Sequence, residues 1–257
     1  MIEIPESINL AKQLEQTVRG KTVKAAIANL SPHKFAFYYG EPTSYSKQLT
    51  EQTVDNTTSF AGQVEISLGN LRLLFNDGIN IRYITDKSKL PKKHQLCLEF
   101  TDNSYLVFTV QMYGCLFLFP EGENENPYYL VAKEKPSPLT NDFSKDYFTK
   151  LYEDTKKTVS VKAFLATEQR IPGLGNGVLQ DILFLTKINP KTKINTLTDS
   201  QIESLFHNVK QTLQKMTDLN GRDTEKDLFG NFGDYQTILS KNTITNPCPV
   251  CHSTIIK

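Results

Sequence analysis

A glycine-rich stretch in the second half of the chain has residue types that can approach a phosphate group. It reads IPGLGNGVLQDILF over residues 171–184, with Gly173, Gly175 and Gly177 around Asn176 directly before an apolar run. Glycines let a backbone come close to another molecule, and the free N–H groups at a helix start suit a phosphate. The spacing lacks the Lys-Ser/Thr of a P-loop, and no strand precedes it as in a dinucleotide fingerprint. An ordinary turn before a helix is therefore the alternative.

Two carboxylates and a proline are crowded into the first six residues of the chain. Glu3 and Glu6 flank Pro5, and an amphipathic stretch follows directly. Carboxylates at the start of a helix complement its dipole and cap its amides, which stabilises the helix by roughly 0.3–1 kcal/mol each. Glu3 is therefore open to two interpretations, a helix cap or a member of a functional site.

Two cysteines near the end of the sequence have the spacing of half a zinc site. Cys248 and Cys251 are separated by two residues, as in a zinc knuckle. A tetrahedral zinc ion needs four ligands, and the adjacent His252 cannot readily supply both that are missing. We therefore expect no fully ligated zinc from these residues, and a complete site only in a longer native chain.

The elements that must position these groups differ between the two halves of the chain. Apolar residues recur at helical spacing from Ile8 to Val18 and Gly20 follows them, so we predict a helix over residues 5–19. Short apolar or alternating runs follow, separated by Asn, Asp, Gly and Pro, which is typical of an antiparallel sandwich or barrel. The predicted strands cover residues 22–30, 34–39, 59–67, 71–75, 80–84, 95–100, 104–110 and 115–119.

A polar stretch with several prolines, residues 121–138, indicates a linker between two domains. After it the apolar residues follow a helical period, with candidate helices over residues 143–153, 160–166, 177–187 and 198–219. The predicted division is a β-sandwich domain over 1–125, a linker over 126–140, an all-helical domain over 141–235 and a cysteine-containing segment over 236–257.

The composition indicates the class of protein but does not indicate which molecule the protein binds. The chain has 257 residues with a formal net charge of +1, so it is a folded globular protein with no general excess of basic residues. No apolar run is long enough to span a membrane and no secretory signal is present, so a membrane partner is excluded. Four cysteines favour a reducing, cytoplasmic location. A monomer is expected.

Several motifs in order along the chain resemble the formamidopyrimidine-DNA glycosylase / endonuclease VIII family. Family members begin with Pro-Glu-Leu-Pro-Glu after the initiator methionine, and Glu3-Ile4-Pro5-Glu6 matches all but the first proline. Gly173-Leu174-Gly175-Asn176 matches the Gly-x-Gly-Asn loop of the family's helix-two-turns-helix module. Residues 221–235 resemble the stretch ahead of the family's zinc finger, and Cys248-Pro249-Val250-Cys251 resembles its first half. The resemblance implies an α+β protein with an N-terminal helix, a β-sandwich and a helix-two-turns-helix domain.

The resemblance also implies a chemistry that starts at the N-terminus. In the family, the N-terminal proline attacks the sugar of a flipped, damaged nucleotide and forms a Schiff base, and the neighbouring Glu assists proton transfer. Glu3 and Glu6 match the family's carboxylates, but position 2 is Ile2. A bulky second residue also hinders removal of Met1. We therefore expect the proline-dependent glycosylase and lyase chemistry to be lost or altered.

The resemblance also covers residues that would contact DNA. The family's residue types are retained in the predicted helical domain and replaced in the predicted β-sandwich domain. Lys162 and Asn176, with Gly175 in the same loop, match residues that contact DNA phosphates. Gln63 stands where the family has a phosphate-contacting lysine. Met112 and Tyr113 stand where an arginine and a phenylalanine enter the gap left by the flipped base, and they could form an apolar wedge or belong to the core.

Three functions remain open from the sequence. The first is binding of double-stranded DNA at a lesion, with the Schiff-base chemistry lost or reduced; structured RNA or the ribosome is the alternative partner. The second is an active DNA N-glycosylase of base excision repair that uses Glu3 and water, or the amine of Met1. The third is a protein-interaction scaffold, which the near-zero net charge favours slightly.

Overall fold

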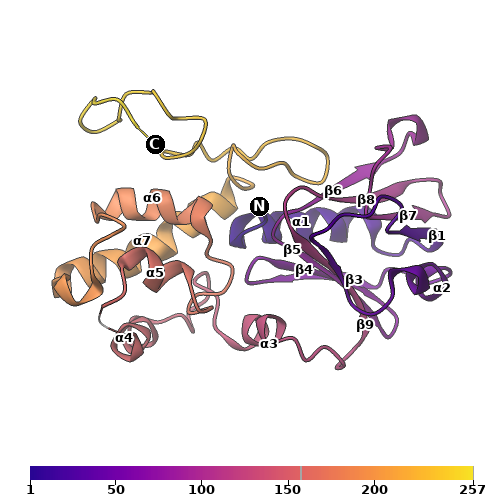
Figure 1. Cartoon of the computed structure of the whole chain (residues 1–257), viewed down its shortest axis with the longest axis horizontal. Helices are drawn as coiled ribbons and strands as arrows, with labels where there is room; N and C mark the ends of the chain where they lie inside the picture. Colours follow the sequence, from indigo (N-terminus) through magenta and orange to yellow (C-terminus); the bar gives the residue numbers. More distant parts are fainter. Residues whose placement is uncertain (157, 257) are drawn as a thin grey trace.

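Two β-sheets packed face to face form the first half of the molecule (Figure 1). The computed structural model describes residues 1–156 and 158–256. One sheet has the strand order β1-β7-β8-β6 and the other has the order β2-β9-β5-β4-β3. Phe75 and Phe108 join the two sheets in the core, with ring centroids 5.3 Å apart. The strands are β1 Val23–Ala28, β2 Ala36–Tyr38, β3 Asn56–Phe60, β4 Gln63–Leu68, β5 Leu71–Asn76, β6 Ile79–Ile84, β7 Leu96–Phe100, β8 Tyr105–Val110 and β9 Gly114–Pro120.

The N-terminal helix α1 (Ile4–Val18) lies between the sandwich and the second half of the molecule. Its bounds differ by one residue at each end from the sequence prediction. Leu10, Leu14 and Val18 are at most 3% exposed, because their helical spacing places them on one face, which packs against the sandwich. Ile4, at the start of the helix, instead belongs to the apolar core of the second half. The first residues of the chain therefore lie where the two halves meet.

Two details of the sandwich differ from the sequence prediction. The run 59–67, predicted as one strand, is a hairpin of β3 and β4, because Ala61 and Gly62 turn the chain with φ of 48° and 76°. Strand β2 pairs with β9 in parallel, whereas the sandwich was predicted to be antiparallel throughout. The remaining strand pairs are antiparallel.

The stretch read as a linker contains helix α3 (Pro127–Glu134), which packs on the outer side of the five-stranded sheet. The Asn126 side chain accepts a hydrogen bond from the N–H of Tyr128, and Pro127 occupies the first turn, which are two local signals of a helix start. The hydroxyl of Tyr129 donates to buried Glu65 on β4 over 2.7 Å. This contact fixes the stretch against the sandwich.

The second half of the molecule is helical and has its own apolar core. Its helices are α4 Lys145–Asp154, α5 Val161–Ala166, α6 Asn176–Thr186 and α7 Asp199–Asp218. A short helix, η3 Ile194–Thr196, precedes α7, and the first half contains the short helices η1 Pro42–Ser44, α2 Tyr45–Leu49 and η2 Lys87–Lys89. Of the helices in the described ranges, none combines the length and apolar character needed to cross a membrane. The chain thus has a two-domain α+β architecture.

Candidate functional site

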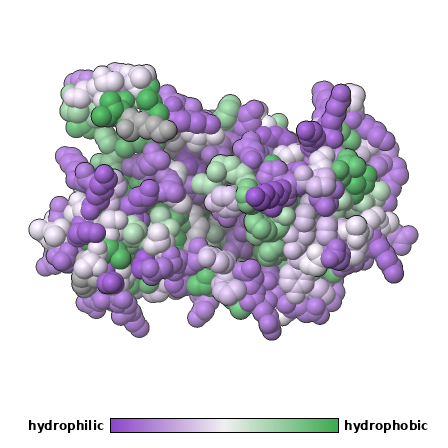
Figure 2. Space-filling model, viewed as in Figure 1, coloured by the Kyte–Doolittle hydropathy of each residue, from purple (hydrophilic) through white to green (hydrophobic). Residues whose placement is uncertain are grey.

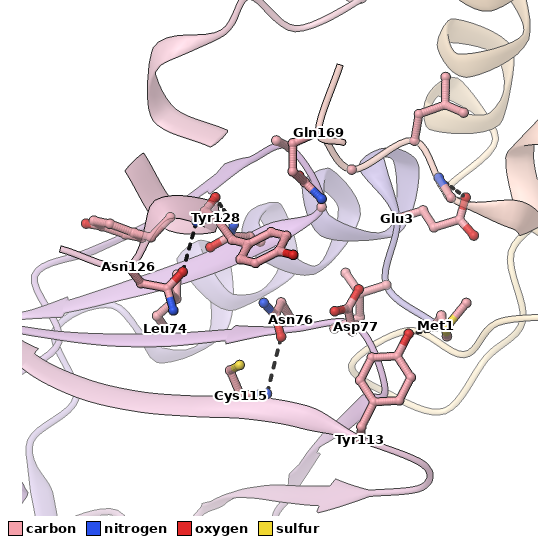
Figure 3. A pocket seen from close by; sticks show the side chains of 18 of the residues that line it. Met1, Glu3, Leu74, Asn76, Asp77, Tyr113, Cys115, Asn126, Tyr128 and Gln169 are labelled. Atoms are coloured by element: carbon pink, nitrogen blue, oxygen red, sulfur yellow. Dashed lines mark hydrogen bonds between the residues drawn. The ribbon is translucent and has the colours of Figure 1, made fainter. Parts of the chain in front are cut away.

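A pocket of about 480 Å³ opens where the sandwich meets the helical half (Figure 3). Its lining residues come from the N-terminus, the 61–63 turn, the end of β5, the start of β9, the start of α3 and the segment before α6. The predicted site residues that line it are Ile2, Glu3, Gln63, Tyr113, Gly175 and Asn176. Tertiary structure therefore brings six residues together that are spread over most of the sequence.

Three of the predicted catalytic and nucleic-acid-binding residues do not line this pocket. Glu6 is 7% exposed and lies behind the pocket wall, so it cannot touch a molecule bound there. Met112 is 64% exposed and lines a smaller hollow beside the N-terminus. Lys162 is exposed at the start of α5 and shares a second cavity with Asn176.

The carboxylate of Glu3 caps helix α6. It accepts hydrogen bonds from the N–H groups of Gly175 at 3.1 Å, Gly177 at 2.8 Å and Val178 at 3.0 Å. Burial raises the pKa of Glu3, although the nearby positive charge of Arg222 and these N–H groups oppose the rise. The N–H groups that the sequence suggested for a phosphate are thus already bonded to a carboxylate of the same chain.

Close approach explains the glycines of the 171–184 stretch. A Cβ on Gly173 would lie 2.2 Å from the carbonyl carbon of Ala61, and one on Gly175 would lie 2.7 Å from the Glu3 carboxyl carbon. A side chain at Gly173 would force the backbone of the 61–62 turn to move, and one at Gly175 would displace the Glu3 carboxylate. The glycines therefore let the 61–62 turn and the N-terminal residues pack directly on the loop before α6.

Arg222 links the N-terminal residues to the segment that follows α7. Its Nε and Nη2 donate to the two oxygens of Glu6 over 2.9 and 2.8 Å, and Nη2 also donates to the Met1 carbonyl oxygen over 3.2 Å. Nη1 lies 3.5 Å from Glu3. Burial alone would raise the pKa of Glu6, but the charge and hydrogen bonds of Arg222 lower it. Sequence reasoning missed this residue, because nothing near Arg222 in the chain indicates a buried partner.

The backbone nitrogen of Ile2 is a peptide N–H and not a free amine. The N–H of Ile2 donates to the carbonyl oxygen of Asp77 over 2.8 Å, and the Ile2 side chain is 6% exposed. The α-ammonium of Met1 forms an ion pair with Glu225. The Tyr113 hydroxyl points to the Met1 sulfur, 3.8 Å away.

Polar groups that the sequence did not single out complete the pocket. Asp77 lies between Asn76 and Met1, with the Tyr113 ring beside it (Figure 3). Burial raises the pKa of Asp77, against the effect of the Met1 ammonium. The Gln63 amide nitrogen donates to the Tyr128 carbonyl oxygen over 3.1 Å. In the sequence, Asp77 belongs to an Asn-Asp-Gly stretch, which is typical of a turn. Such a local pattern does not indicate that the side chain lines a pocket.

The cysteine pair lies at a second, largely apolar cavity of about 720 Å³ between α6 and the C-terminal segment. Lys162, Asn176, Cys248 and Cys251 are among its lining residues. In residues 1–156 and 158–256, no group of three or more His, Cys, Asp or Glu side chains is placed to hold a metal ion. The two thiols are half of a tetrahedral zinc set, so the residues present do not fit a four-ligand zinc site.

Comparisons with known proteins agree with this architecture. The family model described as "Formamidopyrimidine-DNA glycosylase H2TH domain" matches residues 135–227. The formamidopyrimidine-DNA glycosylase of Mycoplasma mobile is 30% identical over 271 residues, covering 100% of this chain and 93% of the relative. That of Lactobacillus delbrueckii subsp. bulgaricus is 27% identical over 269 residues, covering 100% of this chain and 94% of the relative.

Solved structures show the same fold. Lactococcus lactis Fpg (MutM), in complex with DNA containing N7-benzyl-Fapy-dG, superposes with a TM-score of 0.82 at 24% identity. The match covers 99% of this chain and 93% of that one. A complex of Lactococcus lactis Fpg with DNA containing an abasic site gives a TM-score of 0.81. With a 30% identical relative aligned over its whole length, this chain belongs to the formamidopyrimidine-DNA glycosylase family.

Proposed function

We propose that this protein binds double-stranded DNA at a lesion and holds the damaged nucleotide in the pocket between its two domains. The observation that carries the proposal is the meeting of Glu3, Gln63, Tyr113 and Asn176 around one pocket. The relatives are named for action on damaged DNA, and the superposed structures are complexes with lesion-containing DNA.

The helical domain is proposed to position the DNA backbone. Lys162 is exposed and lines the same cavity as Asn176, so an ammonium and an amide can reach neighbouring phosphates. Such contacts position the duplex without reading its sequence. Tyr113, which is 40% exposed at the pocket edge, is the proposed wedge, together with the more exposed Met112.

The proline-dependent reaction is proposed to be lost or altered. A Schiff base needs a free amine, but the nitrogen of Ile2 is a peptide nitrogen whose N–H is bonded to Asp77. The Glu3 carboxylate accepts three backbone N–H groups and lies beside Arg222. Those donors occupy most of its acceptor positions, which favours a structural role.

An active N-glycosylase is the second candidate, and two observations favour it. Glu3 lines the pocket and burial raises its pKa, which suits a carboxyl group that acts as a general acid or base. Met1 also lines the pocket, and its amine could form the Schiff base if it lost its proton to the paired Glu225.

We also propose the domain division 1–125, 126–140, 141–235 and 236–257, and we propose that the cysteine pair in the last unit belongs to a zinc site that needs two further ligands. Two separate apolar cores support the first and third units, and the docked helix α3 makes the second a fixed connection. The cysteine pair supplies two of the four zinc ligands.

One experiment separates the candidates. The protein is incubated with duplexes that carry an oxidised base, an abasic site or neither, binding is measured, and borohydride is then added. Selective binding of the lesion duplexes without a trapped adduct supports binding with lost Schiff-base chemistry. A covalent adduct at the Met1 amine, located by mass spectrometry, supports the amine mechanism instead.

Base release without trapping, abolished by Glu3→Gln, supports the water mechanism. Equal affinity for damaged and undamaged duplexes contradicts the proposal. Binding of structured RNA in place of DNA would move the assignment to an RNA partner.

A further inference from the structure

The charge of the pocket differs from that expected for a site that binds an anion. Among its described lining residues, none is a lysine or arginine. The carboxylates that line it are Glu3 and Asp77, and the cation that lines it is the Met1 ammonium, which is paired with Glu225. With these lining groups ionised, the negative charges outnumber the positive ones.

Asp77 is the carboxylate that a bound molecule can reach. Glu3 and Glu6 are bonded to backbone N–H groups or to Arg222, and Glu225 is paired with Met1. Within the described part of the chain, no hydrogen bond or ion pair reaches the Asp77 side chain, which is half-buried in the pocket wall. Burial raises its pKa although the Met1 ammonium acts in the opposite direction, so a nearby cation would stabilise its charged form.

A second, independent observation is an unsatisfied acceptor in the same pocket. Gln63 is 7% exposed, and its amide nitrogen is bonded to the Tyr128 carbonyl oxygen. Its buried Oε1 has no hydrogen-bond partner in the described structure. A buried acceptor without a partner is unfavourable, so a ligand that donates a hydrogen bond to it gains affinity.

Aromatic rings form part of the remaining wall. Tyr113, Phe117 and Tyr128 line the pocket together with Asp77 and Gln63. Aromatic faces stack on nucleobases and attract cations. The volume of about 480 Å³ lies within the range of small-molecule sites, roughly 300–1,000 Å³.

We propose that the pocket selects a nucleobase that carries a positive charge, such as an N-alkylated purine, over neutral bases. Asp77 faces the charge, Gln63 Oε1 accepts an N–H of the base, and an aromatic ring stacks on its face. A cationic purine suits all three features because its positive charge also makes its N–H groups stronger donors. This inference rests on the proposed binding of damaged DNA and names the class of lesion.

The test uses four duplexes that differ at one position: guanine, N7-methylguanine, 8-oxoguanine or a tetrahydrofuran abasic analogue. Affinities are measured by fluorescence anisotropy in slightly acidic buffer, where the N7-methylguanine ring is cationic. N7-methylguanine should bind about tenfold or more tightly than guanine, which corresponds to about 1.4 kcal/mol, and more tightly than 8-oxoguanine.

Asp77→Asn should reduce the ratio of N7-methylguanine to guanine affinity to near one. Asp77→Glu, which keeps the charge, should retain most of the preference. Asp142→Asn is the matched control, because it removes an exposed carboxylate that does not line the pocket. The ratio of N7-methylguanine to guanine affinity should not change in this variant. Binding of the tetrahydrofuran duplex by each variant shows that the variant is folded.

The outcomes separate this inference from the proposed function. Selective binding of the tetrahydrofuran duplex without a preference for N7-methylguanine overturns the charge inference and leaves the proposed function in place. Retention of the preference by Asp77→Asn also overturns it. Equal binding of the tetrahydrofuran and undamaged duplexes contradicts both.

Discussion

The guanidinium of Arg222 binds both oxygens of the Glu6 carboxylate, with distances of 2.9 and 2.8 Å. Both side chains are buried, and the two residues are 216 positions apart in the chain. Arg222 also donates a hydrogen bond to the Met1 carbonyl oxygen, so the same side chain holds the N-terminus.

Arg222→Met should destabilise the fold strongly. The change leaves Glu6 buried without its cation, and removal of one partner of a buried pair costs about 3–5 kcal/mol. Urea unfolding measures the loss of free energy. Arg19→Met is the control, because the Arg19 side chain is 65% exposed and its pair with Glu15 should be worth at most about 1 kcal/mol. Equal losses in the two variants would contradict the structural role of Arg222.

Gly177→Ala should be destabilising through its contact with Arg222. The added Cβ would lie 1.4 Å from Nη1 of Arg222, so the guanidinium must move, at a cost of roughly 1–3 kcal/mol. In the Arg222→Met background the clash with Nη1 is gone, and the same change should cost less. Unfolding of both single variants and of the double variant gives the coupling. Additive losses would show that the crowding is relieved in another way.

The ion pair between Lys21 and Asp102 should contribute stability that depends on pH. The hydrogen bond from Lys21, followed by that from Ser104, lowers the pKa of Asp102 from 3.8 to about 2. A lowered pKa in the folded state means that the contribution is complete above the usual pKa and is lost as the pH falls towards 2. The stability difference between the wild type and Asp102→Asn should therefore shrink over this window. Urea unfolding at several pH values checks this, and a difference that grows on acidification would contradict it.

Asp181→Ala should release the C-terminal segment from helix α6. Asp181 is fully buried and accepts the N–H groups of Ile238 at 2.9 Å and Leu239 at 2.8 Å. Without this acceptor, both N–H groups should exchange with solvent faster, and proteolysis after residue 239 should increase. Hydrogen–deuterium exchange measures the effect, with Asp142→Ala as the control. Unchanged protection of the two N–H groups would mean that other contacts hold the segment.

Lys162→Ala should weaken binding to all duplexes alike, if the proposed DNA contact is made. Loss of one phosphate contact should reduce the slope of log Kd against log salt concentration by about 0.9. Anisotropy titrations at several salt concentrations give the slope. Lys47→Ala is the control, since Lys47 is exposed on α2, away from the pocket. A loss confined to one lesion, or an unchanged slope, would exclude a phosphate contact.

Local signals in the sequence were sufficient for most of the secondary structure. The apolar spacing up to Val18 and the following Gly20 predicted α1 to within one residue at each end, because helix periodicity and helix stops are properties of neighbouring residues. The same holds for strands such as β7 and β8, bounded by Thr101-Asp102-Asn103. The 61–62 turn was missed because Ala61 is not a residue type that signals a positive φ.

The family resemblance singled out Glu3, Gln63, Tyr113 and Asn176, and all four residues line one pocket. What each side chain does there was decided by tertiary structure. Glu3 faces the N–H groups of α6, and Glu6 is enclosed with Arg222, because elements far apart in the chain pack together. Hydrogen bonding and burial depend on these distant partners, whereas a sequence pattern records only the neighbours of each residue.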